Sequence, residues 1–146
     1  MKFLNAFQPF GLLILRLALG AIFLTHGYPK LTQPSGPLQA MFVQHGLPGQ
    51  LVYVSGVLEA FGGLLLIAGL FTRGTGLLLA IEMGVAILKV HSSHGIMALH
   101  EYEFPLTLAC ACLALATVGA GVVSADHLLF GEGGGSRSRS TKASKK

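Results

Sequence analysis

Charged side chains are scarce in this sequence. Aspartate, glutamate, lysine and arginine make up 11% of its 146 residues, whereas a soluble globular domain has about 25%. Hydrophobic residues make up 52% of the chain, and the mean hydropathy is +0.67. This composition excludes an ordinary soluble domain and predicts an integral membrane protein.

Motifs for common cofactors are also missing. The sequence has no Cys-x-x-Cys pair, no Cys-x-x-Cys-His haem attachment and no His-Glu-x-x-His zinc pair. Its two cysteines, Cys110 and Cys112, lie in an apolar run, where a helix would point their side chains in different directions and disfavour a disulfide. We interpret them as packing groups, and the sequence predicts neither a metal site nor a catalytic residue.

The excess of basic over acidic residues does not indicate nucleic-acid binding. Half of the ten lysines and arginines lie in the last ten residues of the chain, where they act as a topology signal. Together with Lys2 and Arg73 they place seven basic residues on one side of the membrane, against Lys30 and Lys89 near the other. The positive-inside rule therefore predicts that both termini are cytoplasmic, in a bacterial or archaeal plasma membrane.

Four apolar segments are each long enough to cross a bilayer, which takes about 20 residues of helix. They occupy residues 9–28, 50–71, 74–91 and 102–123. The connection between the second and the third is very short, so these two helices should be antiparallel neighbours. The sequence therefore predicts an all-α fold, an integral membrane four-helix bundle.

The connection between the first two predicted spans is long and rich in proline. Its apolar residues favour a short helix lying at the membrane interface. The predicted membrane domain covers residues 10–126, after a cytoplasmic N-terminus at 1–9. Residues 127–146 are rich in glycine, serine and basic residues, which is typical of a disordered tail.

Three ionisable residues fall between the membrane midplane and the predicted cytoplasmic half, with Asp126 at the inner edge: Arg16, Glu59 and Glu82. A charge there costs on the order of 3 kcal/mol, so we expect Arg16 to pair with one carboxylate while the other is protonated or hydrated. This buried polar layer either fixes helix register or handles protons or a substrate.

A second polar cluster gathers toward the predicted outer face: His26, Lys30, Lys89, His91, His94 and Glu103. Four interpretations fit it, namely interfacial residues without a ligand, contact with a quinone headgroup or other small molecule, a metal site and a bis-histidine haem site. The sequence therefore predicts either no cofactor or a bound quinone.

Small residues line one side of the second predicted span at Gly56, Ala60 and Gly63. This spacing lets helices approach closely. Because four helices enclose little volume, a homodimer formed through this face is an open alternative.

The residues resemble those of the DoxX family of small four-span membrane proteins. The resemblance rests on motifs in the first span and around the second, with a looser match beyond: Leu15-Arg16-Leu17, Gly20, Phe23, His26-Gly27, Lys30-Leu31, Leu58-Glu59, Gly62-Gly63, Gly69-Leu70, Thr72-Arg73, then Met83, Ala86, His91, Glu103, Gly119, Gly121, Ser124 and Asp126. The proline and basic residue that the family has between its glycine and serine are absent here.

The resemblance implies a function in redox chemistry. The family takes its name from a small membrane subunit of a thiosulfate–quinone oxidoreductase, and its members are linked to complexes that handle oxidative or thiol stress. The chain would then be a non-catalytic subunit or accessory, anchored in the bilayer beside a membrane or soluble redox partner. Arg16, His26, Glu59 and Glu103 are the residues that the resemblance singles out.

Two other functions stay open at this stage. A small proton-coupled transporter or channel would use the layer of Arg16, Glu59 and Glu82 and would act as an oligomer. A structural or assembly factor would use its polar residues only to fix packing.

Overall fold

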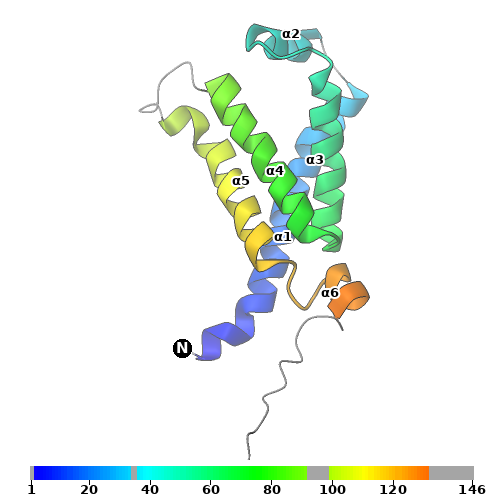
Figure 1. Ribbon diagram of the computed structural model, residues 1–146, viewed down its shortest axis with the longest axis vertical. Helices are drawn as coiled ribbons and strands as arrows, with labels where there is room; N and C mark the ends of the chain where they lie inside the picture. The colour runs from blue at the N-terminus through cyan, green and yellow to red at the C-terminus, as the bar shows by residue number, and fades with distance from the viewer. Residues whose placement is uncertain (1, 34–35, 92–98, 132–146) are drawn as a thin grey trace, which may run out of the picture.

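The computed structural model describes residues 2–33, 36–91 and 99–131, and all of the regular structure in them is helical (Figure 1). This confirms the predicted all-α fold. The elements follow in the order α1 Lys2–Thr32, α2 Gly36–Gln44, α3 Leu51–Ala68, α4 Thr72–Ala86, the π-helix η1 Ile87–His91, α5 Leu99–Val118 and α6 Ala125–Phe130.

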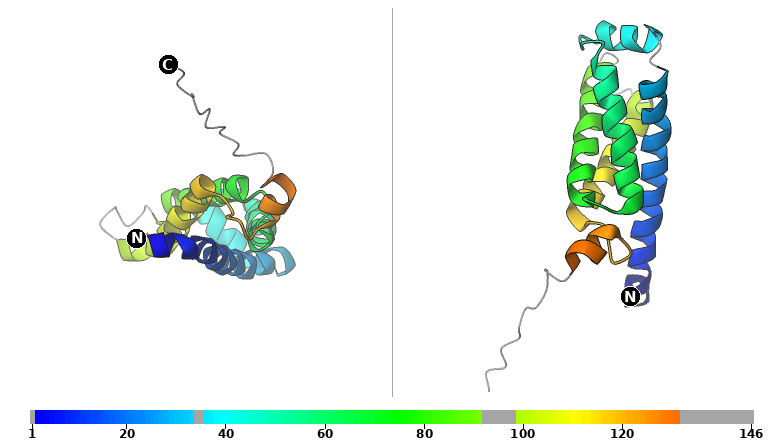
Figure 2. Two further views of the ribbon diagram at one scale, coloured as in Figure 1. Left: turned by 90° about the horizontal axis from the view of Figure 1, so that it is seen from below. Right: turned by 90° about the vertical axis from the view of Figure 1, so that its right-hand side faces the viewer.

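The four long helices form a bundle made of two helix pairs. α1 packs most extensively on α3, and α4 packs most extensively on α5, while a tight turn connects α3 to α4. α2 lies across one end of the bundle, and α6 lies at the opposite end together with the start of α1 (Figures 1 and 2). We call these the α2 end and the α6 end.

Two of the described helices are long and apolar enough to cross a membrane, over Phe7–Thr32 and Leu51–Ala68. Tyr102–Val118 is a shorter apolar helix. The outward faces of the bundle are apolar, with Ile14, Phe61 and similar side chains more than half exposed. An apolar outer surface of this kind is suited to lipid, because lipid tails cover it without cost.

Some helix boundaries differ from the predicted spans. The first span is predicted over residues 9–28, whereas α1 extends over Lys2–Thr32 and continues through Pro9 and Pro29. Membrane helices tolerate such prolines because neighbouring groups satisfy the freed carbonyls. α5 ends at Val118 instead of residue 123, because Gly119 adopts a φ of 93°, in the left-handed region that ends helices.

The interface of α1 and α3 is built from glycines. A Cβ atom added to Gly63 would lie 2.6 Å from the carbonyl oxygen of Gly20, and one added to Gly27 would overlap the backbone at Ala60. The predicted small-residue face therefore does bring two helices close together. Its neighbour is α1 of the same chain, so this face is not available to a second copy.

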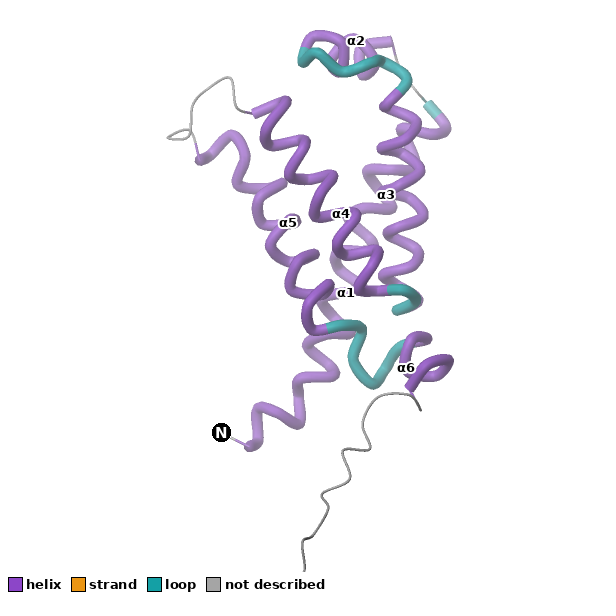
Figure 3. The backbone as a smooth tube through the Cα atoms, in the orientation of Figure 1, coloured by secondary structure: helices purple, strands orange, loops and turns teal. Residues whose placement is uncertain are grey.

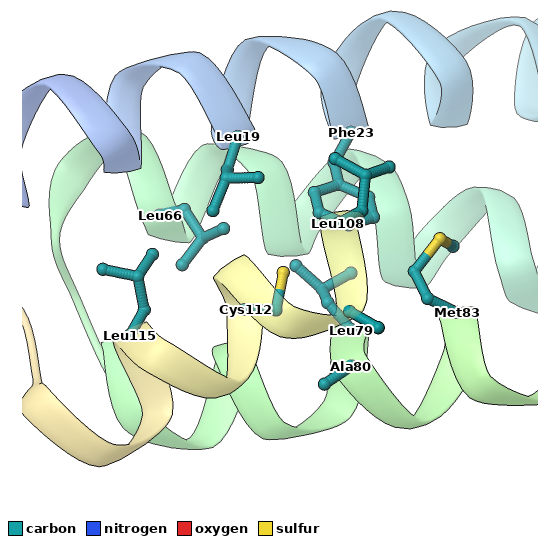
Figure 4. Packing of buried hydrophobic residues seen from close by; sticks show 10 residues of the cluster. Leu19, Phe23, Leu66, Leu79, Ala80, Met83, Leu108, Cys112 and Leu115 are labelled. Atoms are coloured by element: carbon teal, nitrogen blue, oxygen red, sulfur yellow. The ribbon is translucent and has the colours of Figure 1, made fainter. Parts of the chain in front are cut away.

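The core lies between the two helix pairs. Leu19 and Phe23 of α1 meet Leu66 of α3 and Leu79 of α4, together with residues of α5 (Figure 4). Cys112 is part of this core, whereas Cys110 is exposed, and both thiols are free. The packing interpretation of Cys112 is confirmed.

Candidate functional site

A buried ion pair connects α1 and α3 in the half of the bundle nearer the α2 end. Nζ of Lys30 lies 2.6 Å from Oε2 of Glu59 and donates a hydrogen bond of 2.9 Å to Oγ of Ser55. The side chain of Glu59 is 6% exposed and that of Lys30 is 19% exposed. Ser55 and Glu59 are four residues apart in α3, so they share the helix face that meets Lys30.

Glu82 of α4 brings a second carboxyl group to this pair. It lies within electrostatic range of Glu59 and Lys30, with the hydroxyl of Ser55 beside it. Both of its carboxyl oxygens are shielded from solvent, and neither has a partner of full hydrogen-bond geometry among residues 2–33, 36–91 and 99–131. A buried polar group without a partner is costly, so this carboxyl group is available to a bound molecule.

These four polar residues line a cavity of about 520 Å³ between α3 and α4. We call it the α3–α4 cavity. Residues of α2 and of the loop after it cover one end of the cavity: Met41, Phe42 and Leu47. The remaining walls are apolar residues of α3 and α4: Leu51, Val54, Leu58, Leu78, Ile81, Met83, Val85 and Ala86. Clefts of about 300–1,000 Å³ with apolar walls and a few convergent polar groups are typical small-molecule sites.

The predicted pairing of Arg16 with Glu59 or Glu82 is wrong. Arg16 is 1% exposed, and its guanidinium donates to the carbonyl oxygens of Ala120 at 2.6 Å and Val123 at 2.9 Å. The cation beside Glu59 is Lys30. The single layer predicted from the sequence is therefore divided between two sites at different depths.

The second of these sites joins the loop after α5 to the start of α4. Asp126 accepts hydrogen bonds from the backbone N–H groups of Phe71 at 2.6 Å and Thr72 at 2.9 Å, and its own N–H donates to the carbonyl of Gly69 at 2.8 Å. Asp126 also acts electrostatically on Arg16. Figure 3 shows the two connecting segments at the same end of the bundle. Asp126 thus caps α4, a role that the sequence left unassigned.

The predicted outer cluster does not converge in the described residues. His26 is exposed, bonds through Nδ1 to the carbonyl of Ile22 in its own helix, and stacks at 5.9 Å on the ring of Phe104. Glu103 is exposed and lies 3.4 Å from His100. The exposed residue Lys89 does not line the α3–α4 cavity.

The structure does not describe the side chains of two residues of the predicted outer cluster. The side chain of His91 and the whole of His94 lie outside the described residues. Within the described part of the chain, no group of three or more His, Cys, Asp or Glu side chains could hold a metal ion.

Sequence reasoning missed Ser55 and placed Lys30 in the wrong cluster. It ended the first helix at Tyr28, whereas α1 continues through Pro29 to Thr32. Gly20, Gly27 and Lys30 are spaced to lie on one face of a continuous helix, and that face packs on α3. This spacing was the signal that could have paired Lys30 with Glu59.

A family model describes the segment that carries these residues. The DoxX model matches residues 11–92, which include Arg16, Lys30, Ser55, Glu59 and Glu82. The chain belongs to the DoxX family. No solved structure matches it.

Named relatives of this DoxX chain come from several bacteria. It is 34% identical over 120 residues to the Bacillus subtilis protein named "Putative oxidoreductase CatD", covering 82% of this chain and 87% of that protein. It is 32% identical over 121 residues to the Escherichia coli inner membrane protein YqjF, covering 82% and 92%. The chain is a DoxX-family membrane protein, and the lipid bilayer is its environment.

Proposed function

We propose that this DoxX protein is a membrane subunit of an oxidoreductase and that it holds the headgroup of a quinone-type molecule in the α3–α4 cavity. A redox partner protein supplies the electrons, and this chain supplies the membrane anchor and the binding site. The observation that carries the proposal is an apolar cavity of about 520 Å³ that is lined by the Lys30–Glu59 pair and by the carboxyl group of Glu82, whose oxygens are shielded from solvent and lack a partner of full hydrogen-bond geometry among the described residues.

The chemistry of the cavity fits such a molecule. An ammonium group has three N–H donors, and Lys30 donates one to Ser55 and forms an ion pair with Glu59. The third can donate to a quinone carbonyl, and the carboxyl group of Glu82 can hydrogen-bond to the other polar edge of the ring. The apolar walls from α3 and α4 would enclose the ring and its hydrocarbon tail.

The relatives support the redox part of the proposal. One of them carries the word oxidoreductase in its name, and another is named as an inner membrane protein. The proposal accordingly assigns this chain to a bacterial inner membrane. The transporter hypothesis required Arg16 beside Glu59 and Glu82, and Arg16 binds the loop after α5 instead.

A titration with a short-tailed benzoquinone tests the proposal. The full chain is reconstituted in phosphatidylcholine nanodiscs, and heat of binding is measured for the wild type and for Lys30→Met. We expect saturable binding of one molecule per chain and about a tenfold loss of affinity in Lys30→Met, because a charged donor contributes about 1.5–3 kcal/mol to a hydrogen bond.

Two further variants complete this experiment. Lys89→Gln removes an exposed lysine outside the cavity and is expected to keep wild-type affinity. The single variant Lys30→Met leaves the buried carboxylate of Glu59 unpaired, which can destabilise the fold. The double variant Lys30→Met with Glu59→Leu removes both charges, so it is expected to fold. It is expected to bind the quinone more weakly than the wild type does. Equal affinities for the wild type and the double variant would disprove the assigned site.

A further inference from the structure

A second cavity, of about 570 Å³, lies at the α6 end of the bundle. We call it the α6 cavity. Its walls come from the start of α4, the end of α5, the loop 119–124 and α6, and its basic lining residues are Arg73 and His127. It shares no lining residue with the α3–α4 cavity, so the proposed function does not use it.

Arg73 lines this cavity. Its side chain is exposed, and the hydrogen bond recorded for it is a long one of 3.4 Å to the carbonyl oxygen of Val118. A guanidinium group carries five N–H donors in a planar fork. That fork matches two oxygens of a phosphate group, which it can bind in a bidentate manner.

The carboxylate of Asp126 also lines the cavity, and its charge is offset by the groups around it. Its two oxygens accept the backbone N–H groups of Phe71 and Thr72. The buried guanidinium of Arg16 acts on it from the other side. Arg73 therefore remains as the positive charge in excess among the residues that line this cavity.

Phe71 and Phe130 line the cavity, and further exposed apolar side chains lie beside it on α6. Leu128 is 85% exposed, Leu129 67% and Phe130 59%, all on the short helix α6. Phe71 is 59% exposed and lies against Phe130, with ring centroids 6.0 Å apart. Large exposed apolar side chains next to a basic residue suit the boundary between headgroups and acyl chains.

We infer that the α6 cavity binds an anionic phospholipid. The phosphate accepts hydrogen bonds from the fork of Arg73, with the imidazole of His127 as a second donor, and the acyl chains pass over Leu128 and Phe130. The two observations favour the same ligand, because the exposed apolar residues of α6 suit acyl chains and Arg73 beside them suits a phosphate. A soluble anion would bind to Arg73 but would leave the exposed apolar side chains of α6 uncovered.

Native mass spectrometry of the full chain in mild detergent tests this inference. The protein is titrated with phosphatidylglycerol and with phosphatidylcholine of the same acyl chains. We expect tighter binding of phosphatidylglycerol and about a fivefold loss in Arg73→Gln, because a basic residue near an anionic lipid contributes about 1 kcal/mol. Lys89→Gln, an exposed lysine that does not line the cavity, is expected to bind as the wild type does.

A second variant and a competitor separate the remaining outcomes. Leu128→Ser keeps Arg73 and removes an acyl contact on an exposed position, so we expect it to fold and to bind the lipid more weakly. Displacement of the lipid by inorganic phosphate alone would identify a site for free anions and overturn the inference. Equal binding of phosphatidylglycerol to Arg73→Gln and Lys89→Gln would also overturn it.

Discussion

Arg16 is an arginine inside an apolar helix whose direct partners are backbone carbonyls. Its guanidinium donates to Ala120 and Val123 in the loop after α5, and Asp126 acts on it electrostatically. An arginine suits this position because its planar fork reaches two acceptors at once. Arg16 therefore attaches the loop between α5 and α6 to α1.

Replacement of Arg16 by methionine should destabilise the protein by about 3 kcal/mol, because each hydrogen bond to a charged group contributes about 1.5–3 kcal/mol. Thermal unfolding in detergent measures the loss, and limited proteolysis should show faster cleavage at 119–124. Arg73→Met is the matched control, since Arg73 is exposed. If the two variants unfold at the same temperature, Arg16 does not have this role.

The sequence predicted correctly that a buried arginine needs polar partners, and it predicted the wrong ones. Backbone carbonyls in a loop leave no signature in a sequence, whereas Glu59 and Glu82 are visible candidates. The choice between Arg16 and Lys30 as partner of Glu59 depends on the register of α1 against α3. That register is set by backbone contacts such as Gly20 against Gly63, which only the folded chain reveals.

At the scale of the helices, the contact between α1 and α3 determines where Lys30 meets Glu59. The two backbones touch at Gly20 and Gly63, and the side chains of Lys30 and Leu31 pass over Gly56. The ion pair therefore depends on glycines about one to three turns away.

Four helices and the short helix α2 were predicted from the lengths of the apolar runs. The end of α5 was missed because Gly119 ends the helix inside an apolar run.

A methyl group at Gly63 should separate α1 from α3. The Cβ atom of Gly63→Ala would lie 2.6 Å from the carbonyl oxygen of Gly20 and 2.8 Å from the backbone nitrogen of Leu24, and overpacking of this kind costs about 1–3 kcal/mol. The free energy of unfolding in mixed detergent micelles measures the effect.

Gly84→Ala provides the control for this prediction. Gly84 lies inside α4, and a Cβ atom added there meets nothing within 4 Å. We expect this variant to be as stable as the wild type or more stable by up to about 1 kcal/mol, because alanine favours helix. Equal destabilisation by both substitutions would show that the close contact of α1 with α3 is not the cause of the effect at Gly63.

At the scale of the whole molecule, the α3–α4 cavity and the α6 cavity lie at opposite ends of the described bundle and differ in chemistry. The α3–α4 cavity contains a buried ion pair and an orphaned carboxyl group between apolar walls. The α6 cavity contains an exposed arginine surrounded by apolar side chains. The location of both termini in the cytoplasm stays a prediction from the count of basic residues, and with that orientation the α6 cavity faces the inner leaflet.

Photo-crosslinking with an azido-benzoquinone tests the central claim most directly. The full chain in nanodiscs is labelled under light, digested and mapped by mass spectrometry. The account predicts labels within 51–58 and 78–86, lost when unlabelled quinone is added and weaker in the double variant Lys30→Met with Glu59→Leu. Labels on the exposed face at His26 and Phe104, or labels that unlabelled quinone does not displace, would contradict it.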